Sequence, residues 1–470
     1  MQQASGPDVT RVIHRDLNRS YATLVRAEGV YYYDDTGRRY LDGSGGSSSV
    51  TNIGHGVKEV ADAVYKQITT LAYAPTHAFT TEPIEELARL IIENFAPEGM
   101  DRVWFVSGGS EAVESAIKMA IQYHRDRGKP TKHQIISRWS SYHGSTFGAM
   151  AVSGNMPRRT KFLPMLPPSE HIPPCFPYRC WASSTCQDSG CDLTCAHHLE
   201  HTIRQLGPEN VAAFIAEPVV GATLSAQPAS PGYFQEIRRI CDKYDILFIA
   251  DEVMTGFGRT GKNFGIDHWN VIPDMIACAK GMGGGYAPLG GVIVKPEIVG
   301  EVRRTSGTFL VGHTAAGNPL SCATGIAVLN YVLKHDLVGN AANVGLYFKE
   351  QLLGLMEKHL IIGDVRGVGL MLGVELVTDR ATKQPFPPEW KVSQMIASAA
   401  LERGLVTYAL MGTVDGIEGD HMLFTPPLTI TRAEVDELIS IYDQALSVVE
   451  AELAATSPEQ AGDAVQAAPW

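Results

Sequence analysis

A lysine stands between an apolar run and a glycine-rich stretch in the middle of the chain. Residues 275–279 read MIACA, Lys280 follows, and residues 281–291 read GMGGGYAPLGG. The glycines leave no side chains to shield the amine, and burial disfavours its ammonium form. A neutral lysine amine can form a Schiff base with a carbonyl group. Covalent carbonyl chemistry is therefore one interpretation of Lys280, and a solvated charge at the end of a strand is the other.

Polar or ionisable residues also follow three other apolar runs, each of which has the length of a strand. These runs and their polar residues are VWFV (103–106) with Ser107, AAFIA (212–216) with Glu217, and ILFIA (246–250) with Asp251. Because ligands of open α/β sheets bind outside the carboxyl ends of the strands, these side chains should gather beside Lys280. Strands can simply end in polar residues, but that alternative explains one such residue more easily than four at successive strand ends.

Two of these positions suit a phosphorylated pyridine cofactor. Ser107 opens an SGGS turn (107–110) before a helical pattern, and the free backbone N–H groups of a helix start attract phosphate. Asp251 could hold a proton on a pyridine nitrogen, which would turn the ring into an electron sink. A Gly-Gly-Ser turn alone is a weak signal, so the phosphate site is a hypothesis that depends on its neighbours.

The elements that must position these residues alternate between strands and helices. Five short apolar runs without polar alternation have the length of buried parallel strands. They cover residues 103–106, 212–216, 246–250, 275–279 and 291–294. Amphipathic helical patterns lie beside them at 111–125 and 232–244. This alternation predicts an α/β fold with a mainly parallel sheet flanked by helices.

The C-terminal part has a different pattern, which predicts a smaller α+β domain. A glycine-rich strand region lies there at 366–376. Helical patterns precede it at 318–335 and 340–358 and follow it at 389–404 and 431–453. A chain of 470 residues is longer than one core usually serves, so two domains are expected. The predicted division is 1–60 as an N-terminal segment of the small domain, 61–324 as the large domain, 325–455 as the C-terminal small domain, and 456–470 as a disordered tail.

Charge and hydropathy exclude several classes of protein. The formal net charge of −12 argues against a surface for nucleic acid or anionic membranes, because either would require a basic face. No apolar stretch reaches the roughly 18 residues of a membrane helix, and the N-terminus has no apolar signal segment. A cytoplasmic protein is therefore expected, with its eight cysteines as thiols or metal ligands.

Five of the eight cysteines lie within 21 residues, in the segment CFPYRCWASSTCQDSGCDLTC (175–195). They are Cys175, Cys180, Cys186, Cys191 and Cys195. Clustered thiolates can form a four-sulfur site for zinc or hold an iron–sulfur cluster, so four of the five are predicted to bind a metal. His197 or His198 could replace one sulfur. The alternatives are a loop of free thiols, or disulfides in an oxidising compartment.

The segment from Asp251 to Gly291 resembles the signature of class III aminotransferases, the ω-amino acid:pyruvate type, in the subset that carries a cysteine-rich insert. Further motifs of that family follow in order along nearly the whole chain. They are YLDGSGG (40–46), SGGSEAVESAIKMA (107–120), SYHGST (141–146), AEPVVGA (216–222), GHTAAGNPL (312–320), RGVGLMLGVEL (366–376) and TPPLTIT (425–431). The resemblance implies a pyridoxal 5′-phosphate (PLP) enzyme of fold type I, whose large domain binds the cofactor.

The resemblance also implies roles for residues at the ring of the cofactor. Lys280 would hold PLP as a Schiff base and move the proton of the reaction. Asp251 would pair with the pyridine nitrogen. Val253 and Tyr142 would pack on opposite faces of the ring, with His143 beside Tyr142.

Other residues implied by the resemblance would contact the remaining parts of PLP or support the fold. Gly109 and Ser110 would donate backbone N–H groups to the phosphate, and Glu217 would lie near the ring hydroxyl. Thr314 would reach the phosphate of the neighbouring subunit, which implies a homodimer or a dimer of such dimers. Arg259 matches a family position and is interpreted as a structural anchor.

One departure from the family pattern concerns the substrate. Relatives often place a carboxylate-binding arginine shortly before the PPL motif, but residues 404–428 contain no arginine. The predicted reaction is ping-pong transfer of an amino group from a primary amine or ω-amino acid to a 2-oxo acid, pyruvate or 2-oxoglutarate. Ser47, Tyr73, Phe79 and Tyr142 are candidates for the substrate pocket. The alternatives are a racemase or epimerase, an aminomutase or a decarboxylating transaminase on the same scaffold, and more distantly a non-enzymatic metal or redox sensor.

Overall fold

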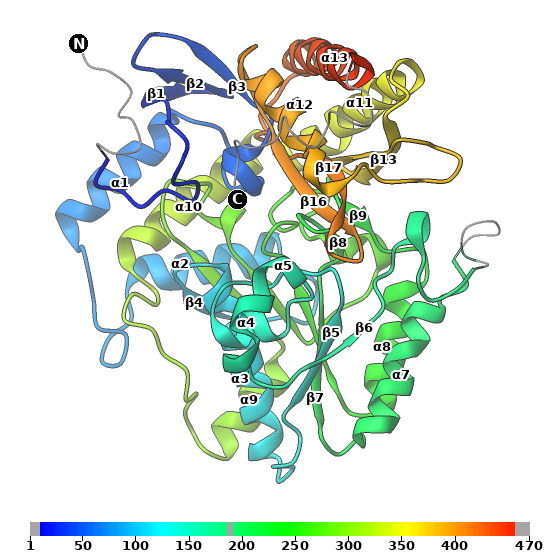
Figure 1. Cartoon of the computed structure of the whole chain (residues 1–470). Helices are drawn as coiled ribbons and strands as arrows, with labels where there is room; N and C mark the ends of the chain where they lie inside the picture. Colours follow the sequence, from blue (N-terminus) through cyan, green and yellow to red (C-terminus); the bar gives the residue numbers. More distant parts are fainter. Residues whose placement is uncertain (1–9, 185, 187–190, 456–470) are drawn as a thin grey trace.

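A seven-stranded sheet forms the centre of the larger part of the molecule (Figure 1). The computed structural model describes residues 10–184, 186 and 191–455, so the predicted tail at 456–470 lies outside the described residues. The spatial order of the strands is β4-β12-β11-β10-β7-β5-β6. In chain order they are β4 (Arg102–Val106), β5 (Gln134–Arg138), β6 (Glu170–Ile172), β7 (Val211–Ala216), β10 (Leu247–Asp251), β11 (Met275–Cys278) and β12 (Gly290–Val294).

The strands of this sheet are parallel to one another except for β12. The prediction of a mainly parallel sheet is thereby confirmed, but the prediction that residues 291–294 form a parallel strand is wrong. Strand β12 runs antiparallel to both of its neighbours, β11 and β4. Only residues 279–289 separate β11 from β12, which is shorter than the crossover that a parallel pair usually requires.

Helices cover both faces of the large sheet, so its central strands are buried on both sides. Ile215 of β7 belongs to the core under α3 (Gly109–Asp126). The next residue towards the N-terminus, Phe214, faces the opposite core, which α7 (Thr194–Leu206) and α8 (Tyr233–Lys243) cover. Burial on two sides explains why these strands are continuous apolar runs in the sequence.

The N-terminal and C-terminal parts of the chain meet in the upper half of Figure 1. One four-stranded sheet contains β1 (Leu24–Glu28), β2 (Tyr31–Asp34), β3 (Arg39–Asp42) and β15 (Leu405–Val406). Another contains β13 (Ile362–Val368), β14 (Met371–Leu376), β16 (Tyr408–Val414) and β17 (Glu418–Phe424). Because β15 pairs with β3, the N-terminal strands share a sheet with the C-terminal part. The domain boundaries themselves stay a prediction.

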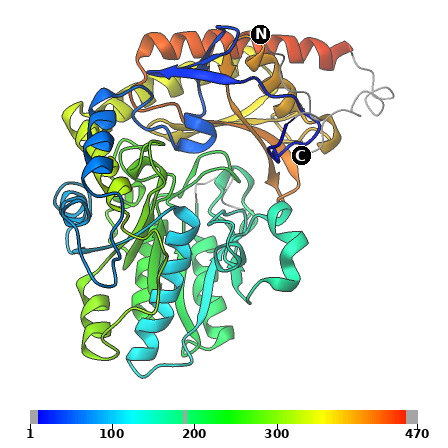
Figure 2. The ribbon, with the colours of Figure 1, turned by 90° about the vertical axis from the view of Figure 1, so that its left-hand side faces the viewer.

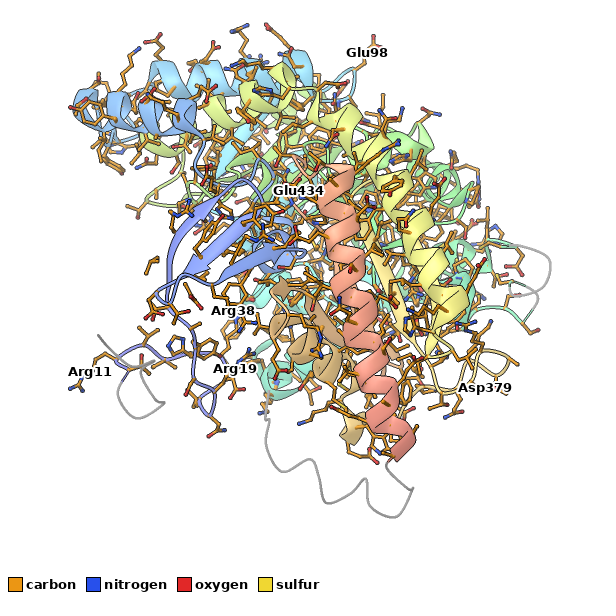
Figure 3. All side chains as sticks on the ribbon, turned by 90° about the horizontal axis from the view of Figure 1, so that it is seen from above. Arg11, Arg19, Arg38, Glu98, Asp379 and Glu434 are labelled. Atoms are coloured by element: carbon orange, nitrogen blue, oxygen red, sulfur yellow. The ribbon has the colours of Figure 1, made fainter. Side chains whose placement is uncertain are left out.

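Four longer helices follow the large sheet in the chain. They are α10 (Pro319–Lys334), α11 (Leu337–Lys358), α12 (Val392–Leu401) and α13 (Arg432–Ala455). Helix α10 spans the predicted boundary at residue 325 and packs on α1 (Lys58–Thr70) and α2 (Glu82–Asn94). Figure 2 shows α13 along the top of the molecule, and Figure 3, seen from above, shows α11 beside it.

Shorter elements complete the part of the chain around the strand ends. They include α4 (Phe147–Ala151), α5 (Met156–Arg159), β8 (Val219–Val220), β9 (Gln227–Pro228) and α9 (Pro296–Arg304). Strands β8 and β9 pair with each other in a small antiparallel sheet after β7. Across the described ranges, no helix is both long enough and apolar enough to cross a membrane.

Candidate active site

A cavity of about 300 Å³ lies at the carboxyl edge of the large sheet. Residues at or just after the carboxyl ends of β4, β7, β10 and β11 line it, including Gly109, Glu217, Asp251 and Lys280. The polar strand ends singled out in the sequence are therefore brought together. Tyr142, which follows β5, also lines the cavity, although the sequence did not predict this strand.

Lys280 begins a short 3-10 turn directly after β11. Its backbone φ is +42°, which is uncommon for a residue with a side chain, and such conformations are concentrated at functional sites. The Nζ atom donates a hydrogen bond to Ser48 Oγ at 3.0 Å. Burial lowers the pKa of the amine to about 8, although the Asp251 and Glu217 carboxylates act in the opposite direction. A substantial fraction of the amine is therefore neutral near pH 8, as nucleophilic attack requires.

The carboxylate of Asp251 is buried at the end of β10 and held from two sides. His143 Nδ1 lies 2.6 Å from Asp251 Oδ2, and the Val253 N–H donates to Asp251 Oδ1 at 3.0 Å. His143 is fixed in turn by its backbone N–H, which donates to Ser153 Oγ at 2.8 Å. The ring of His143 is itself buried and therefore fixed. Through its contact with Oδ2, it orients the Asp251 carboxylate towards the cavity.

Glu217 connects two of the loops that line the cavity. Its Oε1 accepts a hydrogen bond from the Tyr142 N–H at 2.7 Å, and its Oε2 accepts one from the Gly221 N–H at 3.0 Å. Burial raises the pKa of this carboxyl group. These bonds fix the backbone at Tyr142, whose hydroxyl lies 2.9 Å from Ser145 Oγ. Arg158 of α5 stacks on the Tyr142 ring, with 4.6 Å between the guanidinium carbon and the ring centroid.

The N-terminus of α3 forms one wall of the cavity and suits a phosphate group. Gly108, Gly109 and Ser110 line the cavity there, and the first N–H groups of a helix have no partner within the helix. A Cβ atom at Gly109 would lie only 2.7 Å from Val253 Cγ1, so the helix start approaches Val253 as closely as a glycine allows. Ser110 Oγ accepts a hydrogen bond from the Ser145 N–H at 3.0 Å, which steadies the turn.

These groups fit PLP in type and arrangement. The start of α3 offers N–H groups for an anion, Asp251 offers a buried carboxylate for a protonated ring nitrogen, and Lys280 offers an amine. Val253 and Tyr142 add an apolar and an aromatic side chain to the same cavity, which suits a flat ring. When bound, PLP supplies the electron sink that stabilises negative charge at a substrate carbon.

Several residues predicted for the site lie outside the lining of this cavity. Thr314 is exposed, and its carbonyl oxygen accepts a hydrogen bond from the Tyr73 hydroxyl at 3.0 Å. Tyr73 and Phe79 are exposed, and Ser47 does not line the cavity either. Of the four candidates for the substrate pocket, Tyr142 lines this cavity, and a role for the other three stays a prediction.

The residues of the site that the sequence reasoning misses include Ser48, Val50 and Met254. Ser48 holds the Lys280 amine, while Val50 and Met254 line the cavity. The first two belong to an irregular stretch after β3 that reaches the loop after β10, where Ser49 Oγ donates to the Met254 carbonyl at 3.2 Å. The only signal for this stretch is the glycine- and serine-rich sequence that follows the YLDG motif.

Arg259 lies outside the cavity lining and is fully buried. It donates hydrogen bonds to the carbonyl oxygens of Leu370 and Pro426 at 2.9 and 2.5 Å, and to Asn52 Oδ1 at 2.9 Å. These contacts tie the loop after β10 to the N-terminal and C-terminal parts, which is the role of a structural anchor.

The cysteine-rich segment 175–195 follows β6 and ends in the first turn of α7, and none of its described residues lines the cavity. The Sγ atoms of Cys175, Cys191 and Cys195 lie within 4.8 Å of one another. Cys186 Sγ lies 3.9 Å from Cys191 Sγ. The structure thus brings three of the five predicted metal ligands into one group and places Cys186 next to one of them.

The fold and the site together define a PLP-dependent transferase of fold type I. Residues 12–446 match the model of the class III aminotransferases, and the chain belongs to this family. It is 39% identical to the uncharacterized aminotransferase YodT of Bacillus subtilis, over 94% of this chain and 98% of that protein. It is 37% identical to a diaminobutyrate–2-oxoglutarate transaminase of Halomonas elongata, over 91% and 90% of the two chains.

Solved structures of transaminases have the same fold. An (S)-enantioselective omega-transaminase from Thermomicrobium roseum superimposes with a TM-score of 0.84 at 38% identity, covering 92% of this chain and 93% of that one. A PLP-bound amine transaminase from an uncultivated Pseudomonas species superimposes with a TM-score of 0.86 at 34% identity, covering 96% and 98%. The predicted family, fold type and enzyme class are thereby confirmed, and PLP is the cofactor of this family.

Proposed function

We propose that the chain transfers the amino group of a primary amine or ω-amino acid to a 2-oxo acid, pyruvate or 2-oxoglutarate, by ping-pong kinetics. The observation that carries this proposal is the partly neutral Lys280 amine in one cavity with the buried Asp251 carboxylate. The names of two relatives, the diaminobutyrate–2-oxoglutarate transaminase and a probable gamma-aminobutyrate transaminase of Oryza sativa, support a donor whose reacting amine is distant from a carboxylate.

The residues of the site have separate tasks in this reaction. The Nζ atom of Lys280, when neutral, takes a proton from the substrate carbon and returns it during the transfer. Ser48 keeps that atom in place through its 3.0 Å hydrogen bond. Asp251, oriented by His143, balances a positive charge on the ring nitrogen of the cofactor. Met254 and other apolar lining residues limit the access of water.

The proposed carboxylate-binding residue is Arg158, because residues 404–428 contain no arginine that could take this role. Its guanidinium stacks on Tyr142 beside the cavity and forms no ion pair with any carboxylate of the described residues. Burial, and to a smaller extent the Arg158 charge, lower the pKa of Lys280. An unpaired guanidinium can bind a carboxylate through two parallel hydrogen bonds.

The proposed functional unit is a homodimer in which Thr314 of one subunit reaches the cavity of the other. Thr314 is exposed and does not line the cavity of its own chain, which supports a role across an interface. Large apolar side chains near it in space or sequence, including Tyr73 and Leu310, are exposed and would be covered by a second copy. A dimer of dimers and a cytoplasmic location stay predictions of the sequence.

A panel of amine donors tests the proposed function. The PLP-loaded protein would be assayed with primary amines, ω-amino acids and α-amino acids, each with pyruvate and with 2-oxoglutarate. We expect alanine or glutamate to form with primary amines or ω-amino acids. Activity with α-amino acids alone contradicts the proposed donor class, and racemisation of an amino acid without amino transfer contradicts the proposed reaction.

A further inference from the structure

We propose that four cysteines of the segment 175–195 bind one structural zinc ion. The ligands are Cys175, Cys186, Cys191 and Cys195. None of them lines the cavity that holds Lys280, so this site is separate from the chemistry of amino transfer.

Three of the sulfur atoms have the spacing that one zinc ion requires, and the fourth, that of Cys186, lies next to one of them. Four thiolates at about 2.3 Å from a tetrahedral zinc lie roughly 3.8 Å from one another. The Cys186 and Cys191 sulfurs are 3.9 Å apart, and the sulfurs of Cys175, Cys191 and Cys195 are within 4.8 Å of one another. A disulfide would need about 2.05 Å, and all four cysteines are free thiols. Two or four irons with bridging sulfides hold their cysteines farther apart than one ion does, so the spacing favours zinc.

The surroundings of Cys175 and Cys195 suit anionic sulfur. Cys195 lies in the first turn of α7, where the helix dipole stabilises negative charge. The Ser230 N–H donates a hydrogen bond to Cys175 Sγ at 3.2 Å, and such bonds orient and support metal-bound thiolates. Cys175, Cys186 and Cys195 are buried, where thiolates need a cation to offset their charge.

Two of the other candidate ligands, His197 and Cys180, have contacts outside this group of sulfurs. His197 is exposed, and its Nε2 lies 3.5 Å from Glu236 Oε1, so it does not replace a sulfur. Neither Cys180 nor Cys186 is part of the close group of three sulfurs, but Cys186 lies 3.9 Å from one of them, Cys191, whereas Cys180 interacts with Cys186. Cys180 is therefore the spare cysteine of the segment and offers a matched control.

The zinc ion would stiffen a connection between the large sheet and the C-terminal sheet. Within the segment, Arg179 Nε donates to Glu375 Oε1 of β14 at 2.5 Å. Lys383 Nζ, from the C-terminal part, donates to the Tyr178 carbonyl at 2.9 Å. Loss of the ion would loosen these contacts and lower the stability of the fold, while the residues around Lys280 would stay in place.

Metal analysis of the full-length, PLP-loaded protein tests this proposal. After expression in zinc-supplemented medium we expect about one zinc per chain in the wild type and in Cys180→Ser. We expect loss of the ion in Cys191→Ser and in Cys195→Ser. Cobalt taken up in place of zinc should give the absorption bands of a tetrahedral thiolate site.

The zinc-free variants are expected to retain amino transfer at moderate temperature and to melt several degrees below the wild type. A wild type without metal, iron in place of zinc, full zinc occupancy in Cys191→Ser, or an unchanged melting temperature would overturn the proposal. If neither serine variant folds, titration of the wild type with an organic mercurial and a zinc indicator replaces them. Zinc release in step with modification of the thiols is then expected, and no release overturns the proposal.

Discussion

At the scale of single residues, Lys280 sets how the protein responds to pH. Burial lowers the pKa of its amine from 10.5 to about 8, so the amine is mostly protonated below pH 8 and mostly neutral above it. Only the neutral form attacks a carbonyl group. We expect the rate of PLP uptake by the cofactor-free protein to rise about tenfold per pH unit up to about pH 8 and then to level off. Stopped-flow absorbance measures this rate.

The control for this pH profile is Lys280→Ala. It should carry no covalently attached PLP at any pH, as borohydride reduction followed by peptide mass spectrometry would detect. If the profile of the wild type instead bends near 10.5, the ordinary pKa of lysine, then burial does not lower the pKa of this amine.

Arg158 allows a second test at this scale, because its proposed partner is one functional group of the substrate. A charged hydrogen-bonded pair contributes about 1.5–3 kcal/mol, so Arg158→Gln should lower kcat/KM for pyruvate by roughly 10- to 100-fold. An aldehyde acceptor has no carboxylate and should be converted at nearly the rate of the wild type. Steady-state kinetics with both acceptors measure the difference.

Arg125→Gln is the matched control for Arg158→Gln. Arg125 is an exposed arginine in the last turn of α3, at the end of the helix away from the cavity, and its replacement should change neither rate. Equal losses with pyruvate and with the aldehyde would show that Arg158 acts through the Tyr142 ring. No loss with either would place the carboxylate-binding group elsewhere.

At the scale of elements, the start of α3 and the loop after β10 must approach each other closely. A Cβ atom at Gly109 would meet Val253 Cγ1 at 2.7 Å and Cγ2 at 3.1 Å. Gly109→Ala should therefore displace the α3 start or Val253, at a cost of about 1–3 kcal/mol. Because both line the cavity, we expect PLP to bind roughly tenfold or more weakly, as titration of the cofactor-free protein would measure.

A glycine in another helix provides the control for Gly109→Ala. A Cβ atom at Gly300 in α9 would meet no atom within 4 Å. Gly300→Ala should leave PLP affinity unchanged and stabilise the protein by about 0.5–1 kcal/mol, because alanine is the better helix former. Equal PLP affinities of the two variants would mean that the contact with Val253 has no part in cofactor binding.

The sequence predicts the elements of the large sheet where burial is complete and misses them where polar residues are buried. VAAFIA in β7 is apolar throughout because helices cover both of its sides. QIISR in β5 ends in Ser137 and Arg138, which are both buried, and Arg138 donates a hydrogen bond to the Glu217 carbonyl oxygen. No periodicity indicates such partners. The direction of β12 is missed for a related reason, since an apolar run has no direction.

The same limit applies to the candidate site. Lys280, Asp251 and Glu217 could be predicted because each follows an apolar strand, and parallel strands bring their carboxyl ends to one edge. Ser48 and Met254 come from irregular segments whose paths depend on tertiary contacts, such as the hydrogen bond between Ser49 and the Met254 carbonyl. Ser48 and Met254 can therefore be assigned to the site only from the structure.

At the scale of the whole molecule, one chain contains most but not all of the predicted cofactor contacts. Thr314 is exposed on a segment that Tyr73 holds through the 3.0 Å hydrogen bond to its carbonyl oxygen. Tyr65, Tyr73 and Phe79 are also exposed, on and after α1. A second copy that covered this surface would bury these side chains and would bring its own Thr314 to the first cavity, as a symmetric interface requires.

Mixing two inactive variants tests this arrangement. Lys280→Ala removes the reacting amine, and Thr314→Asp would place a negative charge beside the phosphate, so neither variant alone should transfer amino groups at an appreciable rate. A mixed dimer contains one cavity with an intact lysine from one chain and an intact threonine from the other. Unfolding and refolding an equal mixture should make about half of the dimers mixed, which restores about a quarter of the wild-type activity. If Thr314 acted within its own chain, no cavity of the mixed dimer would be intact and refolding the mixture would restore nothing.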